Sequence, residues 1–227
     1  MSWPWENKAA VDERFHAQHP TAFTVTRSDS WSGHGFNVTS FGGGNAAVME
    51  VKTAHLGNNN LRSLLLCDAA SHDPLVSVEE RRFGVAGQRR WEAFKGRDTR
   101  GKDRLFAVVD RTRFFQLGNT VHVFLEGNAT GERVPDFVVR GSYYLGTMTV
   151  SRGNDDDGGG GGGGGFVAQI RNESGLWASL LGENRYSLWI KPGVDQAFLI
   201  ALTVILDQMH SPRYDNSATT PRQSHQN

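Results

Sequence analysis

The sequence predicts an α+β protein, mostly antiparallel β, in which about twelve strands form a closed barrel threaded by a hydrophobic C-terminal helix. Short runs that alternate apolar and polar residues recur from Phe23 onward, which is typical of antiparallel strands with one buried face. One late stretch, residues 197–206, has no polar face in a helix and therefore needs protein on every side. A barrel closed around a helix satisfies both requirements and leaves no exposed sheet edge.

The strands are marked first by strict alternation and then by turn residues. Phe23 and Val25 alternate with threonines, and a turn at residues 42–44, all glycine, precedes another alternating run. Further short runs follow, separated by Gly- and Asn-rich turns. The runs give about a dozen strands, at residues 23–26, 36–39, 47–52, 61–67, 75–82, 90–95, 105–109, 120–126, 137–141, 147–151, 166–171, 176–181 and 186–190.

The central helix is predicted at residues 194–209. Asp195 is placed to cap its start, and Pro212 ends it because proline cannot continue a helix. Such a helix would be about 22 Å long at roughly 1.5 Å per residue, whereas a membrane span must cross about 30 Å. An eight-stranded barrel is filled by its own side chains, so an enclosed helix requires more strands, and about a dozen fits.

One domain, residues 22–210, accounts for most of the chain. Residues 1–21 are polar and are expected to form a loose N-terminal arm, unless its two tryptophans pack across a barrel mouth. Residues 154–165 contain three aspartates followed by eight glycines, which predicts a flexible hairpin loop rather than a phosphate-binding loop. The polar tail at residues 211–227 is expected to be disordered.

Composition excludes several classes of protein. The 24 basic and 24 acidic residues give no net charge, so no nucleic-acid partner is expected. Cys67 is the only cysteine and the N-terminus has no apolar signal-like segment, which together predict a soluble cytoplasmic protein. His16 and His19 have no cysteine partners for zinc, and no GxSxG, HExxH or Walker motif occurs. We therefore expect no metal, no cofactor and no enzymatic activity.

One polar cluster stands out between residues 81 and 104, where nine cations face three carboxylates. On adjacent strands these cations would form a patch for anionic phospholipid, each contributing about 1 kcal/mol near a charged membrane surface. The alternative is that they are ordinary solvated strand faces. The candidate lipid-binding residues are Arg81, Arg82, Arg89, Arg90, Lys95, Arg97, Arg100, Lys102 and Arg104.

Residues 186–198 read YSLWIKPGVDQAF and continue to Leu206-Asp207-Gln208-Met209. This motif resembles the plant LURP-one-related family, whose fold is shared with the tubby C-terminal domain and, more distantly, with phospholipid scramblases. Weaker matches lie at 23–25, 33–38, 90–96, 137–142 and 167–170. The resemblance implies a twelve-stranded barrel around a C-terminal helix and no catalytic residues. The Asp-Gly insertion departs from the family's short turn.

The resemblance also implies a direction for function. The family's name-giving member is linked to plant defence, and tubby domains bind phosphoinositides through basic residues. We therefore expect a non-enzymatic binding or scaffold domain that docks peripherally on anionic phospholipid, at the plasma membrane, or on a protein partner. The alternatives are an enzyme or small-ligand carrier with a pocket at the barrel mouth, and a scramblase-like lipid transporter whose helix leaves the barrel.

Overall fold

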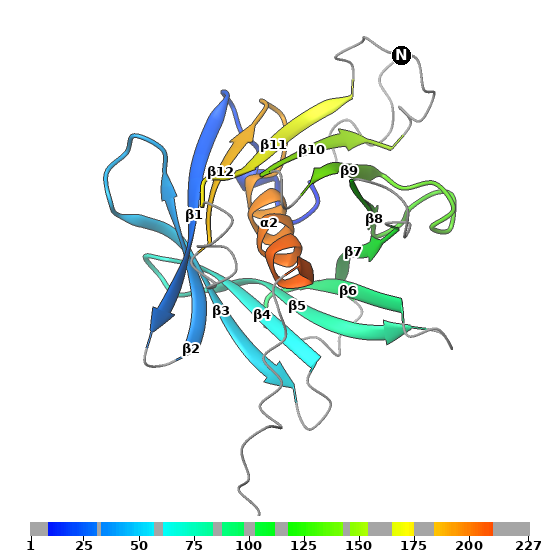
Figure 1. The fold of residues 1–227 in the computed structure, drawn as a ribbon, viewed down its shortest axis with the longest axis horizontal. Coiled ribbons are helices and arrows are strands. Elements are labelled where there is room, and N and C mark those ends of the chain that lie inside the picture. The colour runs from blue at the N-terminus through cyan, green and yellow to red at the C-terminus, as the bar shows by residue number, and fades with distance from the viewer. Residues whose placement is uncertain are drawn as a thin grey trace, which may run out of the picture.

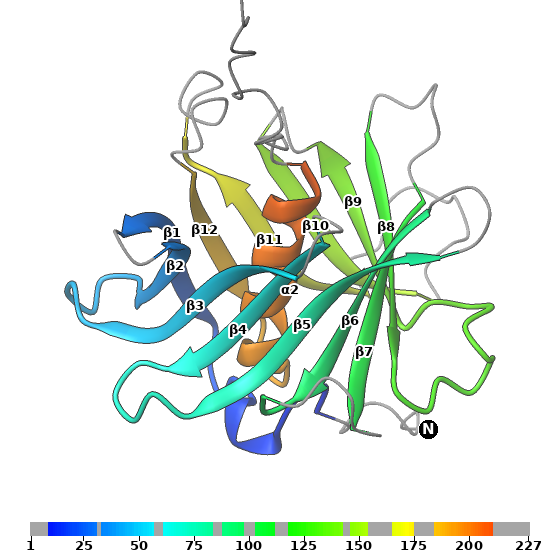
Figure 2. The ribbon, with the colours of Figure 1, turned by 90° about the horizontal axis from the view of Figure 1, so that it is seen from below.

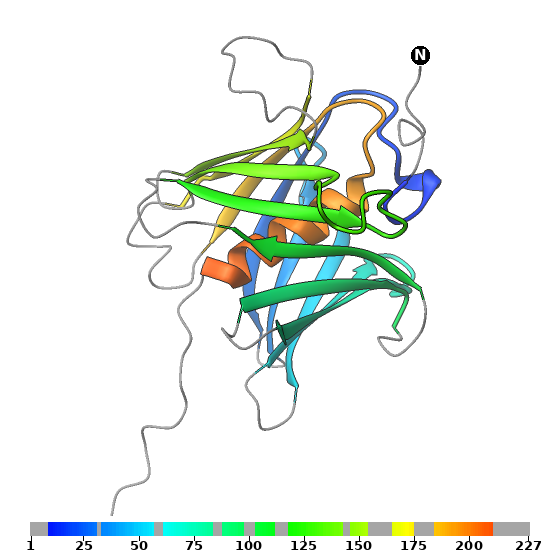
Figure 3. The same ribbon diagram turned by 90° about the vertical axis from the view of Figure 1, so that its right-hand side faces the viewer.

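Twelve antiparallel strands form one closed barrel in the computed structural model, in which β12 closes the ring against β1 (Figure 1). The structure describes residues 9–30, 33–56, 61–83, 88–97, 103–111, 118–142, 146–153, 165–174 and 184–210. Figures 2 and 3, turned by 90° from Figure 1, show helix α2 (Gln196–His210) inside the ring of strands. The predicted fold class is confirmed.

Each strand pairs with its neighbours in sequence, so the barrel is an unbroken meander. The strands are β1 (Thr21–Ser30), β2 (Gly33–Ser40), β3 (Ala47–Leu56), β4 (Leu61–Asp68), β5 (Pro74–Phe83), β6 (Gln88–Lys95), β7 (Arg104–Asp110), β8 (Asn119–Leu125), β9 (Phe137–Ser142), β10 (Thr147–Arg152), β11 (Phe166–Asn172) and β12 (Arg185–Ile190). The strand expected at residues 176–181, the Asp-Gly stretch at 154–164 and the tail at 211–227 lie outside the described residues.

Helix α2 fills the barrel lumen. All residues from 197 to 208 are buried, as an all-round apolar helix requires. Phe198 packs edge-on against Phe106 of β7, with ring centroids 5.0 Å apart, and against Phe137 of β9 at 5.2 Å. Within the described parts of the chain, no helix is long and apolar enough to cross a membrane.

The N-terminal arm is packed against the base of the barrel where the structure describes it, in contrast to the loose arm expected from sequence. Val11 N–H and Asp12 N–H donate to Asp195 Oδ2 at 2.7 and 3.1 Å. Ala17 exchanges main-chain hydrogen bonds with Val194 and Gly193. Ala10, Val11 and Ala17 are buried beside the start of α2, so this stretch covers apolar surface that would otherwise face water. Trp3 and Trp5 lie outside the described residues.

Alternation along each strand separates the lumen from the outer wall. On β12, Tyr186, Leu188 and Ile190 are fully buried, whereas Arg185 and Trp189 are exposed. The pairings of β12 with β1 and β11 place Ala22 and Gln169 beside Trp189, and Thr24 and Arg171 beside Ser187. The most specific sequence motif of the chain therefore contributes both to the core and to an outer surface.

Candidate functional site

The predicted basic cluster lies on the outer wall of β5, β6 and β7, and three of its arginines, Arg81, Arg90 and Arg104, are held by glutamates. Arg81 Nε lies 3.0 Å from Glu92 Oε2 and its Nη2 lies 3.2 Å from Glu79 Oε2. Arg104 Nε lies 2.7 Å from Glu126 Oε2. These contacts lower the positive charge that the wall presents to a ligand.

Arg90 is the most enclosed member of the cluster, with its side chain 12% exposed. Its Nη1 and Nη2 donate to the two carboxylate oxygens of Glu132 at 2.6 and 2.7 Å, and its Nε donates to Glu92 at 2.9 Å. A bidentate pair of this kind is geometrically specific and charge-assisted. Glu132 reaches Arg90 because the turn after β8 is fixed by Asn128, whose Oδ1 accepts from Glu132 N–H at 3.1 Å.

This pairing changes how both side chains titrate. The hydrogen bonds from Arg90 hold the pKa of Glu132 below its usual 4.5, although partial burial opposes the shift. The hydrogen bonds to Glu132 and Glu92 raise the pKa of Arg90. A lowered folded-state pKa means that the pair stabilises the fold above about pH 4.5 and that this contribution is lost as the pH falls through the folded pKa.

Two exposed candidates, Lys95 at the end of β6 and Arg97 just after it, form no ion pair within the described chain, unlike the exposed Arg81. The described part of the cluster has five cations and four glutamates. Two of these glutamates, Glu126 and Glu132, follow β8 in the sequence. The structure describes the backbone but not the side chains of Arg82 and Arg89, and Arg100 and Lys102 lie outside the described residues.

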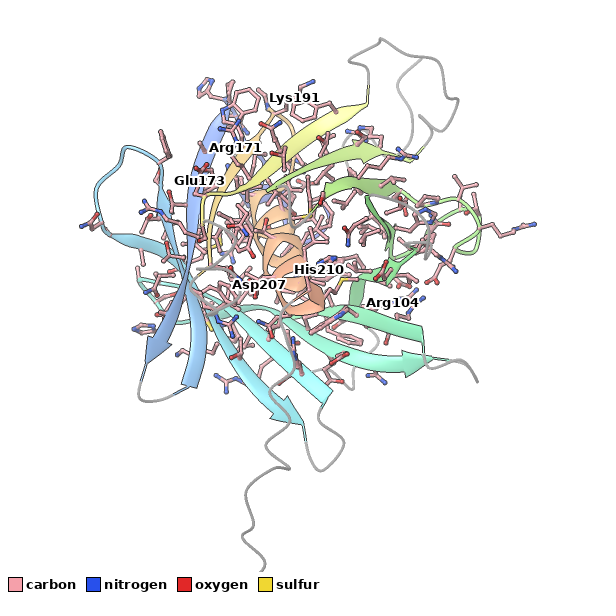
Figure 4. All side chains as sticks on the ribbon, viewed as in Figure 1. Arg104, Arg171, Glu173, Lys191, Asp207 and His210 are labelled. Carbon is pink, nitrogen blue, oxygen red and sulfur yellow. The ribbon has the colours of Figure 1, made fainter. Side chains whose placement is uncertain are left out.

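A buried polar network surrounds the C-terminal end of α2 and was missed by sequence reasoning. Asp207 is fully buried, and its Oδ1 accepts from Tyr186 Oη at 2.7 Å while Arg27 Nη1 lies 3.7 Å from its Oδ2. Asn184 and Gln208 also donate to this carboxylate. The network anchors α2 to β1 and β12, and Figure 4 shows Asp207 and His210 together at this end of the helix.

A second anchor joins the same end of the helix to β4. Arg62 is buried, and its Nη1 donates to the main-chain oxygen of Gln208, a carbonyl at the helix end with no intrahelical partner. The signal that could have found these residues is strand parity. Arg27 follows Phe23 and Val25 on the inward face, just as Arg62 precedes Leu64 and Leu66.

Asp195 anchors the opposite end of the helix. Its Oδ1 accepts from Phe198 N–H at 3.0 Å, which confirms the predicted cap, while Oδ2 binds the arm. Burial raises the pKa of Asp195 above its usual 3.8, against the three main-chain N–H donors that lower it. Its contribution to stability is therefore largest at low pH and is lost as the pH rises through the folded pKa. Beside it lies a small cavity of about 30 Å³.

A much larger hollow lies on the outer wall over β1, β12 and β11. It is an open groove of about 740 Å³, and Phe41, Trp189, Arg171 and Arg185 line it. Figure 4 labels Arg171 and Glu173 on this wall and Arg104 on a different part of the barrel. The groove was not predicted from the sequence. Trp189 nevertheless lies within the motif at residues 186–198, and Arg185 directly precedes that motif.

The described residues hold no group of three or more His, Cys, Asp or Glu that could bind a metal ion. Cys67 is buried on β4, and burial raises the pKa of its thiol. A raised thiol pKa disfavours the reactive thiolate. His122 lies on β8 between the buried residues Val121 and Val123, with its ring centroid 6.1 Å from that of Phe124.

Comparison with known proteins gives consistent matches over the barrel. A family model described as LURP-one-related matches residues 21–207. Protein LURP-one-related 15 of Arabidopsis thaliana is 30% identical over 216 residues, which cover 95% of this chain and 91% of that protein. LURP-one-related 10 of the same plant is 26% identical, covering 89% and 96%, and Protein LURP1 is 24% identical, covering 92% and 94%. No solved structure matches the chain at a significant level.

Proposed function

Because the chain belongs to the LURP-one-related family, and because α2 occupies its barrel lumen, we propose that it is a non-enzymatic binding domain that uses its outer wall. The observation that carries the proposal is the complete burial of residues 197–206, which leaves protein where an enzyme or carrier of this shape would hold its ligand. The same filled lumen weighs against a pocket at the barrel mouth and against a helix that moves into a bilayer.

The proposal includes peripheral binding to anionic phospholipid at the cytoplasmic face of the plasma membrane, in the setting of plant defence. Lys95 and Arg97 support it, because both are exposed and lie two residues apart, Lys95 at the end of β6 and Arg97 in the turn that follows. The arginines held by Glu79, Glu92, Glu126 and Glu132 contribute less, since their charge is largely compensated. Lipid binding would then depend on a few exposed cations and would be sensitive to salt.

Co-sedimentation with liposomes tests this proposal. Phosphoinositide-containing vesicles are expected to bind the protein at about 0.01 M ionic strength and to release it at about 0.15 M, whereas neutral vesicles should bind at neither. The double substitution Lys95→Gln/Arg97→Gln should weaken binding about thirtyfold, because each cation near the surface contributes about 1 kcal/mol.

Lys52→Gln is the matched control, because Lys52 is also exposed but lies on β3, with β4 and β5 between it and β6. It should bind vesicles like the wild type. Absence of binding at low ionic strength would end the lipid proposal and leave a protein-binding scaffold. Equal binding by the wild type and the double variant would show that Lys95 and Arg97 do not contribute to lipid binding.

A further inference from the structure

The outer groove over β1, β12 and β11 combines an uncovered aromatic pair with two arginines that form no ion pair within the described chain. Phe41 is 68% exposed and Trp189 is 45% exposed, and they are two of the four large hydrophobic side chains that are exposed among the described residues. Both line this groove. Large exposed aromatics in one hollow are typical of binding surfaces.

Sheet register explains why these rings are uncovered. Trp189 on β12 stands opposite Ala22 on β1, whose methyl group is too small to cover the indole ring. Phe41 follows β2 and its N–H donates to Ala22 O at 2.9 Å, which places it on the other side of the same alanine. The two rings therefore flank a small residue and form one apolar subsite, which we call the aromatic subsite.

The other end of the groove carries two arginines and one glutamate, Glu173, and is therefore net positive. Arg171 on β11 pairs with Ser187, and Arg185 lies two residues before Ser187 on β12. Such diagonal neighbours are about 7–8 Å apart, close enough for two guanidinium groups to bind one anion. Within the described chain neither arginine is paired with a carboxylate, unlike Arg90 and Arg104. Glu173 is engaged by Ser187, whose Oγ donates to its Oε1 at 2.6 Å.

We propose that this groove docks an acidic peptide segment of a protein partner. An aromatic or aliphatic side chain of the peptide occupies the aromatic subsite at Phe41 and Trp189, and a carboxylate binds between Arg171 and Arg185. The inference rests on the proposed binding function and gives it a site and a class of partner.

The spacing of the two subsites suits an extended peptide. Ser187 and Arg185 precede Trp189 by two and four residues, which corresponds to about 7 and about 13 Å along the strand. An extended ligand spans the same distances when its carboxylate lies two to four positions from its apolar residue. Gln169, which pairs with Trp189, also lines the groove and provides a polar side chain for the ligand backbone.

The closed barrel and the hollow shape of the site favour such a peptide over other partners. Every described strand is paired on both sides, so a partner cannot add a strand to the sheet and must be recognised by side chains. The site is a hollow of about 740 Å³ rather than a flat surface. Arg171 and Arg185 against the single Glu173 leave this end of the groove net positive, which matches an acidic ligand by charge.

Fluorescence polarisation with labelled synthetic peptides tests the inference on the full chain. Each probe has one Trp or Leu in a Gly-Ser background, with aspartates two, three or four positions away, and a matched probe has lysines in their place. We expect at least one aspartate probe to bind with a Kd below about 1 mM, and the lysine probes not to bind.

Two variants test whether the peptide binds in the groove. Arg171→Gln/Arg185→Gln and Trp189→Ser should each weaken binding of the aspartate probe at least about tenfold while keeping the melting temperature of the wild type, since these side chains are exposed. Lys95→Gln/Arg97→Gln is the control, because it removes two cations from another wall and should leave peptide affinity unchanged.

The outcomes separate this inference from the broader proposal. If no aspartate probe binds, or if binding persists in both groove variants, the peptide site is wrong, whatever the liposomes show. Liposome binding that is lost in Arg171→Gln/Arg185→Gln would assign the groove to a membrane and would also overturn the inference. Peptide binding without liposome binding would support the groove as a peptide site and contradict the proposal of phospholipid binding.

Discussion

Replacing Leu202 with aspartate is expected to prevent the barrel from folding. Leu202 lies in the middle of α2 with none of its surface exposed, and apolar side chains line the lumen around it. A carboxylate there would have no described partner, and burying an unpaired charge costs several kcal/mol, which is comparable to the whole stability of a domain. Circular dichroism and size-exclusion chromatography of the purified variant measure the result.

Graded substitutions at the same position separate charge from simple loss of packing. Leu202→Met conserves volume and should cost less than about 1.5 kcal/mol, whereas Leu202→Ala should cost about 2–5 kcal/mol through the cavity it leaves. A Leu202→Asp protein with a native near-ultraviolet spectrum and a melting temperature equal to that of the wild type would contradict the buried position of α2.

Asp207→Ala is expected to destabilise the barrel by about 3–5 kcal/mol. The carboxylate is fully buried and accepts hydrogen bonds from Tyr186, Asn184 and Gln208, with Arg27 Nη1 at 3.7 Å. Removing one partner of a buried polar network leaves the others without their acceptor, which costs more than the net value of the bonds. Urea denaturation should show a lower midpoint with an unchanged slope.

Asp207→Asn is the matched variant because it keeps the shape and one acceptor oxygen. It should lose less stability than Asp207→Ala, because it keeps an acceptor for Tyr186 and Asn184, and its loss relative to the wild type measures the charged contact to Arg27. Equal stability of Asp207→Ala and the wild type would mean that the network does not hold the end of α2 in place.

The barrel and its helix could be predicted because each rests on a local signal. Alternation such as Phe23 and Val25 in β1 assigns an inward face residue by residue, and the ten-residue apolar run in α2 has no stable place except inside protein. The Asp195 cap could be predicted for the same reason, since it acts on Phe198 only three residues away.

The outer surfaces could not be predicted because they depend on contacts between distant segments. Arg90 looked like a free cation, but it meets Glu132, which lies 42 residues later on a turn fixed by Asn128. The groove needs the register of β12 against β1, which places Ala22 rather than a large residue beside Trp189. The polar composition of the N-terminal arm predicted a loose segment. The described part of the arm is instead bound by Asp195 and by the main chain at residues 193 and 194.

Hydrogen exchange of the α2 amides tests most directly whether the barrel stays closed and acts from its outer wall. We expect that the main-chain amides at residues 200–206 exchange only through global unfolding. Their opening free energies should then equal the unfolding free energy from urea denaturation, with and without anionic liposomes. Opening free energies several kcal/mol lower than the global value, or faster exchange in the presence of liposomes, would show that the helix leaves the lumen and would contradict the account.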